Sequence, residues 1–288
     1  MGHGRMRSLR TVARTLRFLL ILLILLIVLL PIYWMANTSF KLQPEIFRVP
    51  PTLVPFGGTL ANYRAIMGGN LAHSIALPRY MQNSLIVALL TVAVTLLLAT
   101  PAAYAFSRVP FRGKRVVIYG VLVSQMLPVV LILIPLYRTF LGLHLLSTYA
   151  GLVIPYLMFS LPFSMWMLKG YFDTIPRELD EAAKVDGCTK MQAMLRVVLP
   201  NLRAGLAATA IVTFIMAWDE FIISLTIMDK DSMRTLPVGL LQSFVGEFTI
   251  KWGEMMAASV ATSIPVIVLF IFLSKYLIGG LISGAIKG

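Results

Sequence analysis

Residues 18–30 read FLLILLILLIVLL, an uninterrupted run of large apolar side chains. With its apolar neighbours the run reaches the roughly 20 residues that an α-helix needs to cross the hydrocarbon core of a bilayer. It is longer than the apolar core of a typical signal peptide, the alternative for this region, and no A-x-A cleavage site follows it. Working outward, we expect six membrane-spanning helices, at residues 16–36, 82–106, 116–137, 149–168, 204–228 and 254–278.

The composition supports a lipid-embedded chain. Of the 288 residues, 58% are hydrophobic and 13% are charged, whereas about a quarter of a typical soluble domain is charged. The net charge of +13 lies between apolar stretches, so it indicates a membrane surface rather than a nucleic acid. A single cysteine, Cys188, excludes an intrachain disulfide, and the three histidines have no metal-ligand spacing. The sequence predicts no metal site.

The distribution of Lys and Arg predicts the orientation. With the N-terminus inside, the expected cytoplasmic segments carry about twice the Lys and Arg density of the external ones. The prediction is an all-α, polytopic membrane protein with six transmembrane helices and cytoplasmic N- and C-termini. We expect a basic N-terminus at 1–15, a transmembrane domain at 16–278 with a long cytoplasmic loop at 169–203, and a C-terminal tail at 279–288.

The 169–203 loop is the most charged part of the chain and has helical periodicity. Pro176 suits a first helical turn, and acidic residues follow it where the helix dipole favours negative charge. Gly187 predicts the end of this short helix. A second amphipathic helix is expected at about 189–199, with Pro200 at its end or at a bend. Two short helices that meet at a glycine suit a protrusion that docks into a groove of another protein.

The same loop resembles a family signature. Glu181-Ala182-Ala183, Gly187, then Val197 and Leu199-Pro200 have the spacing of the EAA loop of ABC importer permeases, with Val197 in place of the usual isoleucine. In that family the loop docks on the ATPase subunit and transmits ATP-driven closure. The resemblance therefore implies an ATPase-coupling role here for the following residues: Glu181, Ala182, Ala183, Asp186, Gly187, Leu199 and Pro200.

The resemblance extends over almost the whole chain and narrows to carbohydrate permeases of the maltose-transporter type. Ser39-Phe40-Lys41 and Asn62-Tyr63 look like their outer loop, and Trp218-Asp219-Glu220-Phe221 resembles a W-N-E-F run with Asp219 replacing Asn. The C-terminus resembles a permease tail that reaches into the ATPase dimer, which implies that role for Gly284, Lys287 and Gly288. A frayed basic end near anionic lipid is the alternative.

The resemblance also implies the partners. They are a second permease subunit, a dimer of ATPase subunits and an extracytoplasmic substrate-binding protein, all at the cell (inner) membrane. The chain has no Walker-type G-x-x-x-x-G-K-[ST] run. We therefore expect no enzymatic activity and no cofactor on this chain, with ATP and Mg²⁺ bound by the partner ATPase.

Candidates for the translocation path come from polar and aromatic residues inside the expected helices. Asp219 and Glu220, beside Trp218, lie about 15 residues into the fifth one, and an ionisable residue at such a position suggests function. A structural hydrogen bond between helices is an equally good reading. Four aromatic residues share one face of the fourth expected helix, where packing or lipid contact is the commoner role: Tyr156, Phe159, Phe163 and Trp166.

Two alternatives stay open. An acidic path would suit a polyamine, and related permeases also carry glycerol phosphodiesters, so the same importer class with a non-sugar cargo is the first alternative. A stand-alone secondary transporter is the second, but such transporters often have two related halves, and we find no internal repeat in this sequence.

Overall fold

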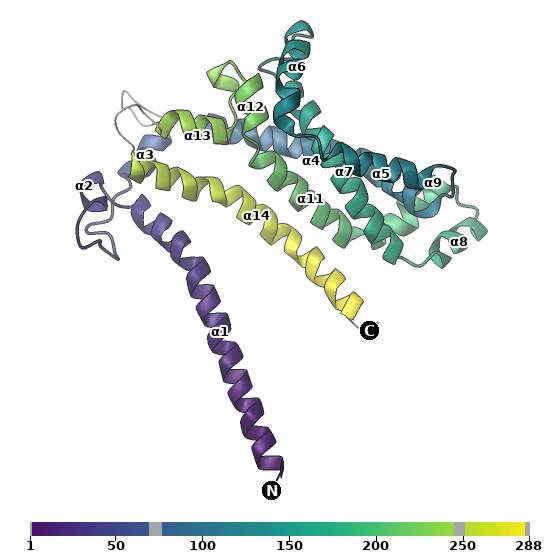
Figure 1. Ribbon diagram of the computed structural model, residues 1–288, viewed down its shortest axis with the longest axis horizontal. Coiled ribbons are helices and arrows are strands. Elements are labelled where there is room, and N and C mark those ends of the chain that lie inside the picture. Colours follow the sequence, from purple (N-terminus) through teal and green to yellow (C-terminus); the bar gives the residue numbers. More distant parts are fainter. Residues whose placement is uncertain (1, 69–76, 245–250, 286–288) are drawn as a thin grey trace. The chain divides into compact units, whose positions relative to one another are not determined.

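The computed structural model describes residues 2–68, 77–244 and 251–285, and these residues form helices and loops without a strand (Figure 1). The helices in chain order are α1 (Gly2–Ser39), α2 (Gln43–Ile46), α3 (Ala61–Ile66), α4 (Leu77–Arg108), α5 (Lys114–Ser124), α6 (Val129–Gly142), α7 (Tyr149–Thr174), α8 (Glu178–Val185), α9 (Lys190–Ala193), the π-helical turn η1 (Met194–Val198), α10 (Leu199–Asn201), α11 (Arg203–Trp218), α12 (Ile222–Ile227), the 3₁₀ turn η2 (Asp231–Met233), α13 (Leu236–Phe244) and α14 (Trp252–Ala285).

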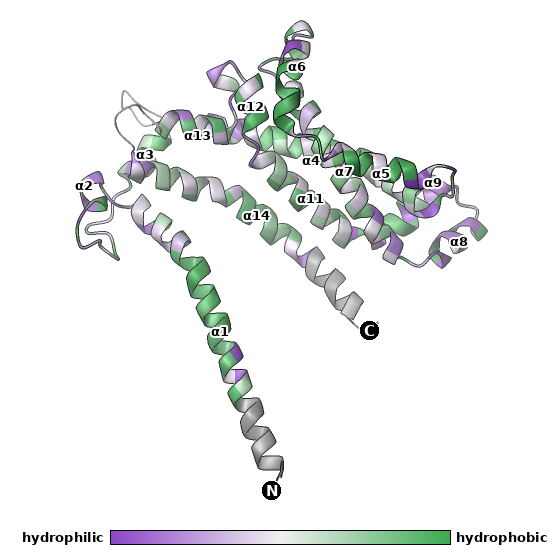
Figure 2. Ribbon diagram, viewed as in Figure 1, coloured by the Kyte–Doolittle hydropathy of each residue, from purple (hydrophilic) through white to green (hydrophobic). Residues whose placement is uncertain are grey.

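Four described helices are long and apolar enough to cross a membrane: α1, α4, α7 and α14. Two bent pairs also qualify if each is one span. The pairs are α5 with α6, at 87°, and the segment Lys190–Asn201 with α11, at 81°. Figure 2 shows apolar residues concentrated in α1, α5 and α6, and polar residues in α8 and α9. The all-helical, multi-span prediction is confirmed, with four to six candidate spans.

The chain divides into two compact units, of which the first comprises Met1–Ile75 and Ser243–Ala261. In this unit the Asn62 amide donates to the backbone oxygens of Ser39 at 2.9 Å and Lys41 at 2.8 Å. The Lys41 side chain is buried, and its ammonium group donates to the backbone oxygen of Thr52 at 2.5 Å. Two sequence motifs some twenty residues apart, Ser39-Phe40-Lys41 and Asn62-Tyr63, are thus parts of one hydrogen-bonded loop structure.

Glu45 organises the same loop. Its Oε1 accepts hydrogen bonds from the Phe56 N–H at 2.8 Å and from the Thr52 hydroxyl at 2.9 Å. The Phe56 N–H, followed by the Thr52 hydroxyl and nearby cations, lowers the pKa of Glu45 below its ordinary 4.5, against a smaller opposing effect of desolvation. The ionised carboxylate therefore supports the folded loop.

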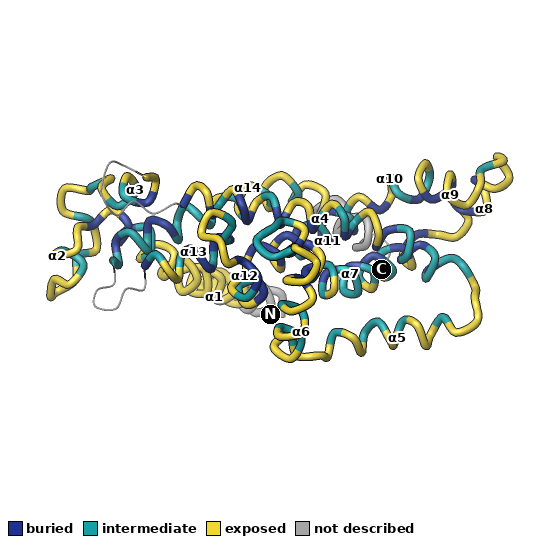
Figure 3. Tube along the Cα trace, turned by 90° about the horizontal axis from the view of Figure 1, so that it is seen from above, coloured by how far each residue is buried: buried dark blue, intermediate teal, exposed yellow. Residues whose placement is uncertain are grey.

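The second unit comprises Ala76–Gln242 and Thr262–Gly288. Within it α4 packs along α7, and α11 packs against both helices. Small side chains let the helices approach closely, and hydroxyl groups at the contact form hydrogen bonds from one helix to the next. Thr95 on α4 bonds Ser160 on α7 at 2.8 Å, and Ser164 on α7 bonds Thr213 on α11 at 3.1 Å. Figure 3 shows buried residues along these helices and exposed residues in α5 and α8.

The third expected helix, 116–137, is not continuous. α5 ends at Ser124, and α6 begins only after Pro128, at 87° to α5. The physical reason is Pro128, since the ring of a proline moves the preceding residue out of the helical region. Pro128 is the N-cap of α6, with extended backbone, rather than a kink inside a helix.

The fifth expected helix, 204–228, is also interrupted. α11 ends at Trp218, and α12 begins at Ile222. Asp219 and Glu220 therefore lie in a break between two helices, and the prediction that they lie inside one helix was wrong. The physical reason is local, because the Glu220 carboxylate accepts N–H groups at the start of α12 and so favours a new helix start.

Candidate functional site

The loop between α7 and α11 has the two-helix form that its sequence predicts. α8 has Glu178, Asp180 and Glu181 in its first turn and Lys184 in its last, a charge order that suits the helix dipole. The helix ends where Gly187 adopts φ +80°. We refer to residues 175–201 as the coupling loop.

Gly187 closes α8 through a two-bond C-terminal cap. The Cys188 N–H donates to the Ala183 oxygen at 2.9 Å, and the Gly187 N–H donates to the Lys184 oxygen at 3.0 Å. This pattern is a Schellman motif, which needs a left-handed residue at the position of the glycine. The reversal lets α9 start immediately after the turn.

Thr189 starts the second helix with a capping box. Its hydroxyl accepts the Gln192 N–H, and the Gln192 side chain accepts the Thr189 N–H. Both bonds satisfy N–H groups that the first helical turn leaves without partners.

A widened π turn, η1, then precedes Pro200. Proline lacks an N–H, and its ring crowds the carbonyl four residues earlier, so a wider turn relieves the crowding. The second helix continues to Asn201 and meets α11 at an 81° bend.

The sequence-predicted coupling residues differ in exposure. Glu181, Ala182, Asp186 and Gly187 are exposed, and so is Pro200. Ala183 is buried and Leu199 is half-buried. Three apolar side chains on the same loop are also exposed, at 87%, 56% and 50%: Val185, Met191 and Leu195. We refer to these three residues as the exposed apolar residues of the coupling loop.

A buried polar cluster fixes α8 to the end of α4. The Asp180 carboxylate accepts the Tyr104 hydroxyl at 2.5 Å and lies 3.0 Å from the Arg108 guanidinium. Arg108 also donates to the Ile175 oxygen at 2.6 Å. Sequence reasoning missed these roles, because 76 positions separate Tyr104 from Asp180 and no spacing rule joins them.

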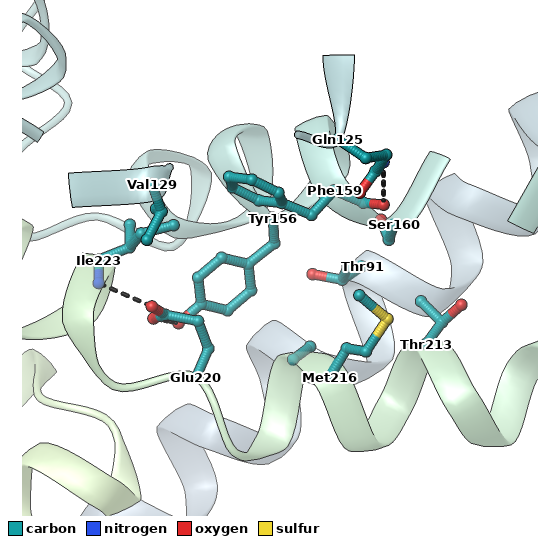
Figure 4. A pocket seen from close by; sticks show the side chains of 11 residues that line it. Thr91, Gln125, Val129, Tyr156, Phe159, Ser160, Thr213, Met216, Glu220 and Ile223 are labelled. Atoms are coloured by element: carbon teal, nitrogen blue, oxygen red, sulfur yellow. Dashed lines mark hydrogen bonds between the residues drawn. The ribbon is translucent and has the colours of Figure 1, made fainter. Parts of the chain in front are cut away.

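A second candidate site is a cavity of about 290 Å³ inside the second unit. Figure 4 shows its lining side chains, which come from α4, the α5–α6 link, α6, α7, α11, the α11–α12 link and α12. The lining residues are Thr91, Gln125, Val129, Tyr156, Phe159, Ser160, Thr213, Met216, Ala217, Glu220 and Ile223. The sequence-predicted path residues Tyr156, Phe159 and Glu220 are among them.

Glu220 is the one charged residue among the described residues that line this cavity, and its oxygens have partners. Oε1 accepts the Ile223 N–H at 2.7 Å, and Oε2 accepts the Ser224 N–H at 3.1 Å and the Tyr156 hydroxyl at 2.7 Å. The carboxylate therefore caps α12, where the helix dipole favours negative charge. Its two oxygens together accept three hydrogen bonds from the protein.

The other path candidates lie elsewhere. Trp218 is buried and stacks on Phe214, with ring centroids 5.4 Å apart, while Asp219 is exposed. Phe163 is half-buried, and Trp166 is exposed, away from the cavity. The aromatic face of α7 therefore divides, with only Tyr156 and Phe159 at the cavity.

The cavity also includes polar residues that the sequence did not single out: Thr91, Gln125, Ser160 and Thr213. Such residues are common in membrane helices, so their type carries no signal until packing brings them together. Of the C-terminal tail, Gly284 lies in the last turns of α14. Lys287 and Gly288 lie outside the described residues.

Comparison with known proteins places these features in a family. Residues 96–282 match the family described as "Binding-protein-dependent transport system inner membrane component". The sulfoquinovosyl glycerol transport system permease protein SmoH of Agrobacterium fabrum is 35% identical over 90% of this chain and 88% of its own length. The trehalose/maltose transport system permease protein MalG of Thermococcus litoralis is 36% identical, over 90% and 91%.

A solved structure shares the fold. A chain of a bacterial ABC transporter that imports the polysaccharide alginate superposes with a TM-score of 0.77, at 20% identity, over 92% of this chain and 96% of that one. The family match covers most of the chain and includes both the coupling loop and the cavity residues of α7 and α11. This chain is a multi-pass membrane protein that belongs to the family of inner membrane components of binding-protein-dependent transport systems.

Proposed function

We propose that this chain is one permease subunit of an ABC importer for a sugar or oligosaccharide and forms half of its translocation path. Relatives that match about nine-tenths of the chain are named as permeases for trehalose and maltose and for sulfoquinovosyl glycerol. Family membership argues against a stand-alone secondary transporter.

The cavity chemistry carries the sugar assignment. Its lining combines hydroxyl and amide groups with two aromatic rings, the combination that binds the polar edges and apolar faces of a sugar. The Thr91 hydroxyl is buried and has no hydrogen-bond partner among the described residues. It points toward the cavity (Figure 4), and we infer that it bonds a ligand hydroxyl once the lining adjusts around the ligand.

The same lining argues against a polyamine, the main alternative cargo. A polycation would need unpaired carboxylates, but Asp219 is exposed outside the cavity and Glu220 already accepts three hydrogen bonds. A cation would have to compete with the α12 N-terminus for that carboxylate.

The coupling loop supports docking on a separate ATPase. The large apolar side chains of Val185, Met191 and Leu195 are exposed on this charged loop, as expected for residues that a partner covers. The proposal places ATP and Mg²⁺ on that ATPase dimer and assigns this chain no catalytic step. The roles of the EAA residues and of the tail residues Gly284, Lys287 and Gly288 are part of the same proposal.

For the topology, we propose six spans in the cell inner membrane: α1, α4, α7 and α14, the bent pair of α5 and α6, and α11 with α12. The coupling loop and both termini then lie in the cytoplasm. The apolar side chains of α1 between Val12 and Tyr33 are exposed, which suits contact with lipid or with a second permease subunit. An extracytoplasmic binding protein delivers the sugar.

Two experiments test this function. Purification of the tagged chain from native membranes in mild detergent is expected to retain an ATPase and a second permease. The complex, with its binding protein and ATP in liposomes, is then assayed with labelled trehalose, maltose and spermidine. Uptake of spermidine with neither sugar would contradict the sugar assignment.

A matched pair of variants links uptake to the cavity. Thr91→Val removes the unpartnered hydroxyl at nearly constant volume, and we expect sugar uptake to fall by about tenfold, the equivalent of one ligand hydrogen bond of about 1.4 kcal/mol. Thr139→Val is the control, because Thr139 is exposed on α6 and, among the described residues, its hydroxyl bonds the Pro135 oxygen of its own helix. Equal uptake by both variants would place the sugar path elsewhere.

A further inference from the structure

The buried cluster of Tyr104, Arg108 and Asp180 joins the coupling loop to a membrane helix. We propose that Asp180 is a positioning residue for transport, which holds α8 to the end of α4 so that movement of the docked loop reaches the cavity. This inference rests on the proposed function and assigns a task to three residues that lie outside the EAA motif itself.

The cluster contains an ion pair that solvent hardly reaches. The Arg108 and Asp180 side chains are each 8% exposed, and Nε lies 3.0 Å from Oδ2. Neither of these two atoms has a well-aligned hydrogen bond among the described residues, so charge attraction holds them together. If one partner is lost, the other becomes an uncompensated buried charge, which is strongly unfavourable.

The polar contacts of Asp180 fix the orientation of α8, which apolar packing alone would not do. Leu179 and Ala183 place α8 against the apolar core of the unit, but apolar contacts tolerate sliding. The Asp180 carboxylate is held at both oxygens, by the Tyr104 hydroxyl at Oδ1 and by Arg108 at Oδ2. Arg108 also bonds the Ile175 oxygen just before α8. These contacts fix the angle of α8 to α4.

α4 connects the cluster to the cavity. It is one continuous helix from Leu77 to Arg108, and it places Thr91 in the cavity wall. At 1.5 Å per residue, Thr91 lies about 25 Å along the helix from Arg108. Hydrogen bonds such as Thr95 to Ser160 tie the intervening part of α4 to α7. A shift of α8 therefore moves the end of the helix that carries Thr91.

The test measures the coupling ratio, the sugar transported per ATP hydrolysed, in liposomes that hold the complete complex. Asp180→Asn keeps an acceptor for Tyr104 but removes the charge that faces Arg108, and we expect the ratio to fall at least about tenfold. Tyr104→Phe removes only the hydroxyl and keeps the ring that packs edge-on against Phe172 at 5.6 Å. For this milder variant we expect a fall of about two- to fivefold.

The matched control is Asp173→Asn. Asp173 accepts the Ser107 hydroxyl at 2.6 Å, so it ties the same end of α4 to α7, but none of its described contacts reaches α8. We expect an unchanged coupling ratio. The exchange Arg108→Asp with Asp180→Arg restores opposite charges, and we expect partial recovery of the ratio.

The outcomes separate this inference from the proposed function. If the wild-type complex lacks ATP-driven uptake, the proposed function fails. If wild type transports and Tyr104→Phe and Asp180→Asn assemble with unchanged ratios, the positioning role is overturned. An equal loss in Asp173→Asn also overturns it, because the effect would then reflect general damage at the end of α4. If Asp180→Asn does not assemble, the coupling ratio of Tyr104→Phe decides whether the cluster has the positioning role.

Discussion

Gly187 offers a graded perturbation of the coupling loop. Its backbone φ is +80°, and a Cβ added there would meet nothing within 4 Å. Substitution therefore costs backbone strain and causes no clash. For an ordinary L-residue the left-handed conformation costs about 1–2 kcal/mol, but asparagine tolerates it better. A penalty of that size lowers the population of the closed turn about 5- to 30-fold.

The expected order of ATP-driven uptake is therefore wild type, then Gly187→Asn, then Gly187→Ala, with Gly187→Val lowest because a β-branched side chain is stiffest in this region. The assay is sugar uptake by the complete complex in liposomes, with subunit content measured on the same vesicles. All variants should insert, since the membrane helices are unchanged. Equal uptake by Gly187→Val and Gly187→Asn in assembled complexes would refute the role assigned to this turn.

Three further predictions concern other parts of the chain. Gly205→Ala on α11 would place a Cβ 2.6 Å from the Cγ of a tyrosine on α7, so we expect the unfolding temperature in detergent to fall by an amount equivalent to about 1–3 kcal/mol. Gly170→Ala, with open space around it, should instead stabilise its helix slightly, and the reverse order would contradict this packing. The pKa of Glu45 is lowered chiefly by the Phe56 N–H, so its contribution to loop stability is complete above the unfolded value near 4.5 and is lost as the pH falls through the lower folded value. Proteolysis of the loop should rise in that acidic range in wild type, and Glu45→Gln should lose this dependence. Glu220→Ala should destabilise the start of α12 by about 1 kcal/mol, as loss of a helix cap does, with Glu220→Gln closer to wild type in hydrogen exchange at Ile223.

Much of the fold was predictable because its signals are local. Length and apolarity identified α1, α4, α7 and α14, since a membrane imposes the same length on any helix that crosses it. The glycine-hinged coupling loop was equally predictable, because Gly187 and the residues that cap its two helices lie within a few positions of one another.

The breaks were harder to predict because hydropathy does not register them. The breaks are short, and the apolar helices on either side keep the average hydropathy of each expected span high. From the sequence, Pro128 could have kinked a continuous helix, but in the structure it is the N-cap of α6 and separates two helices. At Glu220 the carboxylate gained partners on both α7 and α12, so a helix break became favourable.

The sequence by itself determined that the chain is a helical membrane protein with a charged loop that carries a recognised family spacing. These properties depend on composition and on neighbours along the chain, which a linear reading contains. Tertiary structure alone decided that the Tyr156 hydroxyl bonds Glu220, that Thr91 points into a cavity and that Arg108 meets Asp180. Each of these needs helices distant in sequence to pack side by side, and the free energy of that packing comes from many weak contacts that no short motif records.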